Sequence, residues 1–197
     1  MTSRARKGQE LVPGGGIAEL DRLSRVLVMK VGVHLNEPWE AIVERKLLEE
    51  ETAGVIYWGY GGSVCHPLTQ VQPFAEYGSP VTILMIRTMS DFVGRSVPTV
   101  AASRDGRSWE PIPEGVTTSG RYALILRSLR TTTEHLDLGA YAVAIGPKEG
   151  TPLTRYLRGR VDKACARVAS VPLGSDRRSV ILRADLVAPY AVVLKTI

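Results

Sequence analysis

The sequence predicts an α+β fold, with a mixed or mainly antiparallel curled sheet of about seven strands and two main helices. Short β-branched apolar runs recur along the chain and outnumber the long helical patterns. These runs do not alternate with helices as a doubly wound parallel sheet requires. Hydrophobic residues make up 44% of the 197 residues and charged residues 23%, as is typical of a globular protein.

The length of the chain suits one sizeable hydrophobic core. Residues 1–16 carry several basic side chains, followed by Pro13 and three consecutive glycines, and they show no periodicity. Three glycines are costly to order because each loses much backbone entropy. We therefore predict a flexible basic tail over 1–16 and a single α+β domain over 17–197.

In the first half of the chain the patterns predict strand, helix and strand. Residues 26–33 are β-rich and almost continuously apolar, which is typical of a buried strand. Residues 37–51 form the first predicted helix, which Gly54 ends, and their apolar residues recur at helical spacing: Trp39, Ile42, Val43 and Leu47. Residues 55–58 are the second predicted strand.

Five further apolar runs predict strands in the rest of the chain. Ala188 and Pro189 mark a bend between the last two of them. The stretch 94–120 is rich in Gly, Pro, Ser and Asp, which favours turns. The predicted strands are residues 81–87, 122–127, 141–145, 180–186 and 191–195.

The second predicted helix covers 152–168 and has a basic face. Its apolar residues share one side at helical spacing: Leu153, Leu157, Val161, Ala164 and Val168. Gly159 weakens the pattern. Its basic residues would contact successive phosphates of a nucleic acid: Arg155, Arg158, Arg160, Lys163 and Arg167. The alternative is a solvated outer face, the commonest fate of such a stripe.

The charge distribution favours the same partner. The formal net charge is +5, and residues 151–197 contain nine Lys and Arg against three Asp. An uneven basic field attracts polyanions, of which nucleic acid is the commonest in a cell. The alternative is a surface charge that serves solubility.

An aromatic and glycine-rich segment follows the second predicted strand. Tyr57, Trp58 and Tyr60 offer flat faces on which a base can stack. The neighbouring small residues let a backbone approach a ligand closely: Gly59, Gly61, Gly62 and Ser63. Our leading hypothesis is therefore a nucleic-acid-associated binding domain, for DNA or RNA. The alternative for this segment is a tight turn whose aromatic rings pack in the core.

A second hypothesis is an enzyme acting on a small metabolite or nucleotide, with Cys65, His66 or His135 as the reactive group. Cys65 and His66 are adjacent and therefore point apart, and a free cysteine is often a buried small hydrophobe. No Cys or His spacing is typical of a metal site, so we expect no metal and no cofactor.

A third hypothesis is a non-catalytic subunit of a larger assembly, with a protein partner or a homo-oligomer formed around Trp109. No apolar run approaches the ~18 residues of a membrane span, and the basic N-terminus lacks the apolar region of a secretory signal. With only two cysteines, we expect a cytoplasmic protein with reduced thiols and no membrane partner.

Two short stretches resemble known families. Residues 36–43 resemble the Pro-Trp helix opening of the ASCH group of small RNA-associated barrels, although the Gly-x-Lys signature expected next is absent. Residues 57–63 resemble the Tyr-Gly loop of γ-glutamylcyclotransferases. In that family the loop follows the first strand, whereas here a strand and a helix precede it. Neither resemblance transfers functional residues to this chain.

Overall fold

The structure is a computed structural model that describes residues 20, 23–32, 37–88, 96–171 and 174–197. The predicted tail over 1–16 lies outside the described residues. The elements, in chain order, are β1 (Arg25–Val31), α2 (Trp39–Ala53), β2 (Ile56–Tyr60), the π-helical turn η1 (Pro67–Val71), α3 (Gln72–Glu76), β3 (Thr82–Arg87), β4 (Val97–Ser103), β5 (Glu110–Pro111), β6 (Thr117–Thr118), β7 (Tyr122–Thr131), β8 (His135–Asp137), the 3₁₀ turn η2 (Leu138–Ala140), β9 (Tyr141–Val143), α4 (Leu153–Tyr156), β10 (Lys163–Val168) and β11 (Arg177–Thr196).

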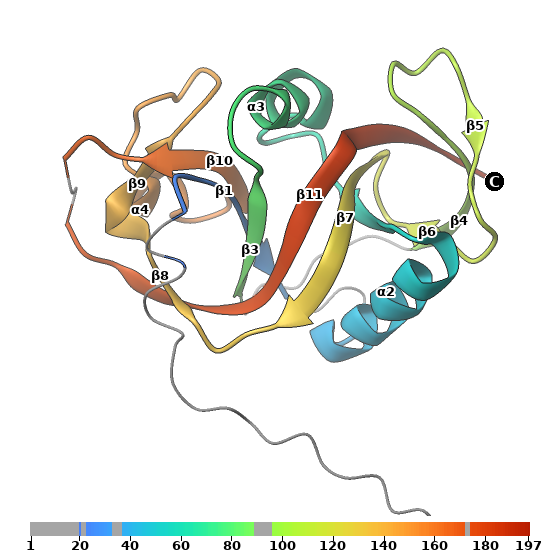
Figure 1. Ribbon diagram of the computed structural model, residues 1–197, viewed down its shortest axis with the longest axis horizontal. Coiled ribbons are helices and arrows are strands. Elements are labelled where there is room, and N and C mark those ends of the chain that lie inside the picture. Colours follow the sequence, from blue (N-terminus) through green and yellow to red (C-terminus); the bar gives the residue numbers. More distant parts are fainter. Residues whose placement is uncertain (1–19, 21–22, 33–36, 89–95, 172–173) are drawn as a thin grey trace, which may run out of the picture.

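The predicted α+β class with a mixed, mainly antiparallel sheet is confirmed. Among the described residues the sheet has 11 strands, and its main path runs β2-β7-β11-β3-β1-β10-β9 (Figure 1). β1 and β3 pair in parallel, whereas the other ladders along this path are antiparallel. The sheet is neither curled nor closed, so the predicted curl is not found.

β1 lies between two hydrophobic cores, and each of its faces packs into one of them. Leu27, Met29 and Val31 pack into the main core, together with residues of β2, β3, β7, β11, α2 and α3. Val26 and Val28 point the opposite way, into a second core with α4 and η2. This alternation follows from the two-residue period of a strand. α2 and α4 lie at opposite ends of the sheet (Figure 1).

The first predicted helix is confirmed as α2, which begins and ends two residues later than expected. Gly54 ends it in the left-handed conformation at φ 72°, which glycine adopts without steric cost. The last two predicted strands are one continuous strand, β11, whose pairing with β7 shifts register between Leu186 and Ala191. The predicted bend at Ala188 and Pro189 is thus an irregularity inside β11.

The predicted helix over 152–168 is wrong. Only α4, Leu153–Tyr156, is helical, and the chain turns at Gly159, where φ is +67°. The remainder forms β10, which pairs with β1 on one side and β9 on the other. These ladders satisfy backbone groups over both edges of β10, and this tertiary pairing outweighs the local helical spacing.

Candidate functional site

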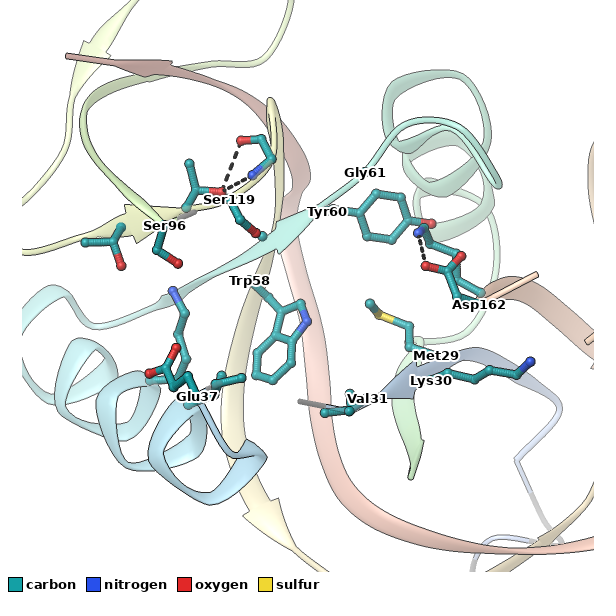
Figure 2. A pocket seen from close by; sticks show the side chains of 18 of the residues that line it. Met29, Lys30, Val31, Glu37, Trp58, Tyr60, Gly61, Ser96, Ser119 and Asp162 are labelled. Atoms are coloured by element: carbon teal, nitrogen blue, oxygen red, sulfur yellow. Dashed lines mark hydrogen bonds and ion pairs between the residues drawn. The ribbon is translucent and has the colours of Figure 1, made fainter. Parts of the chain in front are cut away.

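A cavity of about 400 Å³ lies on the main-core side of β1 (Figure 2). Its walls come from the C-terminal end of β1, from β2 and the residues that follow it, from α2, from the turn over 117–120 and from the start of β10. Met29 and Val31 contribute apolar surface, and Trp58 contributes an indole ring that is 8% exposed. The cavity therefore combines an apolar floor with polar walls.

Three ion pairs surround the cavity. Arg45 of α2 donates to both carboxylate oxygens of Glu37, at 3.2 and 3.0 Å. Lys46 donates to Glu49 at 2.7 Å and to the carbonyl of Tyr57 at 2.6 Å, and both side chains of this pair are nearly fully buried. The Lys163 ammonium lies 2.7 Å from Asp162 (Figure 2). Arg45, Lys46 and Lys163 are thus each matched by an acidic side chain, whereas Lys30, which also lines the cavity, donates to the carbonyl of Gly159.

Burial sets the electrostatics of the Lys46 pair. Desolvation lowers the pKa of Lys46, and the charge of Glu49 opposes that change. Glu49 also accepts a hydrogen bond from the backbone N–H of Tyr57. This network joins α2 to β2 and holds Trp58 of the same strand at the cavity wall.

Hydroxyl groups line another part of the wall. Thr117 accepts a hydrogen bond from Arg45 at 3.1 Å, and the hydroxyl of Thr118 bridges the carbonyl and N–H of Gly120. Ser63, Ser96 and Ser119 also line the cavity. Hydroxyls both donate and accept, so this wall suits a ligand with both kinds of polar group.

Tyr60 connects the cavity to a pair of thiols. Its ring is buried beneath the Lys163 ammonium, 4.7 Å from the ring centroid, and burial raises its pKa well above the usual value. Its hydroxyl donates to the carbonyl of Cys65 at 2.7 Å. The Cys65 Sγ lies 3.5 Å from the Cys165 Sγ of β10.

His66 follows Cys65 in the same loop and packs against Tyr122. Its Nε2 lies 3.3 Å from the Tyr122 hydroxyl, and the two rings meet edge to face. Its Nδ1 is buried with no hydrogen-bond partner among the described residues. Gly62 is required here because a Cβ would lie 2.8 Å from the Tyr122 ring.

A second hollow, of about 390 Å³, lies on the second-core side of β1, and we call it the basic groove. Four basic residues and one acidic residue line it: Lys30, Arg87, Arg158, Arg178 and Asp176. The Lys30 side chain points away from Trp58 (Figure 2), and its ammonium donates to the carbonyl of Gly159 at 3.1 Å. The cavity and the basic groove thus lie on opposite faces of β1.

The structure separates the residues predicted for nucleic-acid binding. Trp58 and Tyr60 face the main core, whereas Tyr57 is half-buried on the opposite side of β2, against a third core. Gly59, Gly61 and Ser63 line the cavity, as does Lys163. Arg155, Arg158 and Arg160 are exposed in α4 and the turn after it, and Arg167 is exposed and paired with Glu149 at 3.0 Å.

The reactive residues proposed from the sequence are only partly brought together. Cys65 and His66 lie in one loop, and Cys165 joins them from β10. His135 is exposed in β8, where its Nε2 lies 3.3 Å from the Ser179 hydroxyl.

Sequence reasoning missed the charged residues of the cavity, above all Glu37, Arg45, Lys46, Glu49 and Asp162. For Lys46 and Glu49 a signal existed. They follow Ile42 and Val43 at helical spacing and so occupy the buried side of the predicted helix, where unpaired charges are rarely tolerated. No comparable pattern in the sequence marks Glu37, Asp162 or the turn over 117–120 as part of a site.

Among the described residues no group of three or more His, Cys, Asp and Glu side chains gathers that could hold a metal ion. In the same part of the chain, no helix is long and apolar enough to cross a membrane. Comparisons with family models, curated proteins and solved structures found no match. Function is therefore inferred from the geometry of the cavity and the basic groove.

Proposed function

We propose that the cavity binds a nucleoside. The observation that carries this proposal is the combination of the Trp58 indole with paired charges and hydroxyls around a volume of about 400 Å³. Small-molecule sites commonly enclose ~300–1,000 Å³ and combine apolar surface with a few polar groups that fix orientation.

The balance of charges at the cavity favours a planar polar ring over a bare anion. Arg45, Lys46 and Lys163 each have an acidic partner within 3.0 Å, so little positive charge is left for a multiply charged ligand. A nucleobase offers hydrogen-bond donors and acceptors along one edge and a flat face for an indole. The hydroxyls of Ser63, Ser96 and Ser119 suit the ribose.

Trp58 provides the readout for a binding test. A panel of nucleosides and mononucleotides is titrated at millimolar concentrations while tryptophan fluorescence and heat of binding are followed. We expect saturable quenching that Trp58→Phe abolishes and that Trp109→Phe, a change of an exposed ring, leaves in place. Calorimetry of the Trp58→Phe protein should show an affinity weaker by at most roughly tenfold, because complete loss of an aromatic ring costs about 1–3 kcal/mol and the phenyl ring keeps part of the stacking surface.

Controls in the panel separate other ligands. Free monosaccharides test the hydroxyl wall alone, and inorganic phosphate tests simple anion binding. If monosaccharides bind and nucleosides do not, the proposal is wrong about the ligand class. If none of the nucleosides binds, the proposal is wrong altogether.

The basic groove supports a second candidate, the binding of a single-stranded nucleic acid. Arg158 and Arg178 are exposed there, and Asp176 is the single acidic residue of the described lining. Arginine contacts phosphates through two parallel hydrogen bonds. In this candidate the arginines after α4 contact the backbone, while Trp58 and Tyr60 belong to the cavity on the other face.

A salt titration with a fluorescent oligonucleotide tests the second candidate. Affinity should fall steeply with salt, and removing one phosphate-binding side chain should reduce the slope of log affinity against log salt by about 0.7. The double variant R158A/R178A should therefore weaken binding and flatten the slope. Arg107→Ala, in the exposed turn between β4 and β5, is the matched control. Equal slopes for the two variants would contradict the candidate.

A further inference from the structure

The two cysteines of the chain come from distant parts of the sequence and meet in one place. Cys65 follows β2 in the glycine-containing loop, and Cys165 lies in β10, 100 residues further on. Their sulfur atoms are 3.5 Å apart, whereas a disulfide bond needs a separation of about 2.05 Å. A shift of the loop by ~1.5 Å would join them.

We propose that Cys65 and Cys165 form a reversible disulfide when a hydroperoxide reaches the loop, and that Cys65 reacts first. The disulfide depends on the thiol geometry and is independent of the ligand proposed for the cavity. Both cysteines are thiols in this structure. The chain contains no third cysteine that could compete for the bond.

Burial assigns different roles to the two thiols. Cys165 is 1% exposed and packed within the main core, so it is shielded from solutes, while Cys65 is only partly buried. Desolvation raises the pKa of Cys165 well above its ordinary value. The hydrogen bond from Cys165 and the charge of Lys163 lower the pKa of Cys65 from 9 to about 7, although its own burial opposes this. Cys65 is therefore the thiolate near neutral pH.

The contacts of Cys65 fix its position beside Cys165. Its backbone is in the left-handed region at φ 51°, which a non-glycine residue holds only where surrounding contacts enforce it. The hydrogen bond from Tyr60 to its carbonyl is one such contact, and Gln70 holds the next residue by accepting from the N–H of His66 at 2.6 Å. The loop thus presents Cys65 to its partner in the resting state.

The reaction proceeds in two balanced steps. The Cys65 thiolate attacks one oxygen of the hydroperoxide, the O–O bond breaks, and a sulfenic acid forms while the other oxygen leaves with a proton as water or an alcohol. Cys165 then attacks the Cys65 sulfur, the S–O bond breaks, and the hydroxyl leaves with the Cys165 proton as water. Two thiols lose two electrons in total, and the hydroperoxide gains them.

The test treats the reduced full-length protein with hydrogen peroxide and measures its intact mass and peptide map. We expect the mass to fall by two hydrogens, a Cys65–Cys165 linked peptide, and full recovery of both thiols with a dithiol reductant. The melting temperature of the oxidised protein should rise by roughly 5–15 °C, because the bond closes a long loop of the unfolded chain.

Two variants test the order of the steps. Cys165→Ser should stop at a Cys65 sulfenic acid that dimedone traps, and Cys65→Ser should leave Cys165 unmodified. The rate of Cys65 alkylation in Cys165→Ala and in the wild type reports the pKa. The wild-type midpoint should lie near pH 7 and should move upward in Cys165→Ala, which removes the hydrogen bond from the thiol.

Several outcomes would overturn the proposal. These are retention of both thiols in the wild type, accumulation of sulfinic acid on Cys65, or a linkage found only between molecules. Oxidation of Cys165 in Cys65→Ser would overturn the assigned order of attack. The wild-type peptide map gives a decision even if a variant fails to fold.

Discussion

The cavity and the basic groove lie on opposite faces of β1, and both are rich in charged residues. The charged residues of the two regions differ in how far they are exposed to solvent. At the cavity, Arg45, Lys46 and Lys163 each lie within 3.0 Å of a carboxylate and are at most about one-third exposed. At the groove, Arg178 is 55% exposed although it also has an acidic partner. Since net electrostatic stabilisation depends on solvent exposure, the same kind of ion pair should have different effects on the two faces.

The largest effect should come from the buried pair. Lys46→Met leaves Glu49 as an uncompensated buried charge and should lower the free energy of unfolding by about 3–5 kcal/mol, measured by urea denaturation. The double variant K46M/E49Q keeps an acceptor for the N–H of Tyr57 and removes the charge, so it should recover at least ~1 kcal/mol. A loss below ~1 kcal/mol for Lys46→Met would show that water reaches this pair.

An intermediate effect is expected at the rim of the cavity. The Arg45 and Glu37 side chains are 32% and 30% exposed. Glu37→Gln removes the two-point contact between them and should lower the free energy of unfolding by about 0.5–1 kcal/mol. High salt should reduce this cost, because the pair is within reach of counterions. Glu44→Gln, an exposed change in the same helix, is the control and should stay within ~0.5 kcal/mol of the wild type. Equal effects of Glu37→Gln and Glu44→Gln on the free energy of unfolding would mean that the Glu37–Arg45 pair does not stabilise the protein measurably.

The smallest effect is expected at the groove. Arg178→Ala breaks the exposed pair with Asp176 and should change the free energy of unfolding by less than ~0.5 kcal/mol. Arg177→Ala, at the neighbouring exposed position, should behave alike in the same urea titration. A loss above ~1 kcal/mol at Arg178 alone would mean that the groove is as rigidly built as the cavity.

The features that the sequence predicted are those that depend on local patterns, and the features that it missed depend on pairing between distant segments. The α+β class, α2 with its Gly54 end and the apolar strands follow from local patterns that packing reinforces. Residues 97–118 have the composition of turns and yet contain β4, β5 and β6, because those short strands depend on pairing and not on apolar periodicity.

The predicted helix over 152–168 failed for the same reason. Leu153 and Leu157 are buried as helical spacing predicts, but in β10 four consecutive residues, Lys163 to Ala166, are buried, because this strand is covered on both faces. Val168, assigned to the apolar face of the helix, is 48% exposed. Gly159 is the local signal that the helix ends, and it outweighs the apolar spacing on either side of it.

Of the residues that line the cavity, local patterns predicted only the aromatic and glycine cluster and Lys163 as site residues. Trp58, Gly59, Tyr60, Gly61 and Ser63 do line the cavity. Their partners Asp162 and Lys163 are about 100 residues away in the chain, and only the pairing of β10 with β1 brings them there. A pattern read along the chain cannot place residues that meet through a sheet.

The central position of β11 constrains how this chain can fold as it is synthesised. β11 lies between β7 and β3, so before it emerges from the ribosome the main path of the sheet consists of two unconnected parts, β2 with β7 and β3 with β1, β10 and β9, and β4 with β5 and β6 is separate from both. The facing edges of β3 and β7 then have unpaired backbone groups, which attract other strands. We expect nascent chains that stop before Arg177 to bind chaperones, and release to coincide with the synthesis of the long strand that joins both parts.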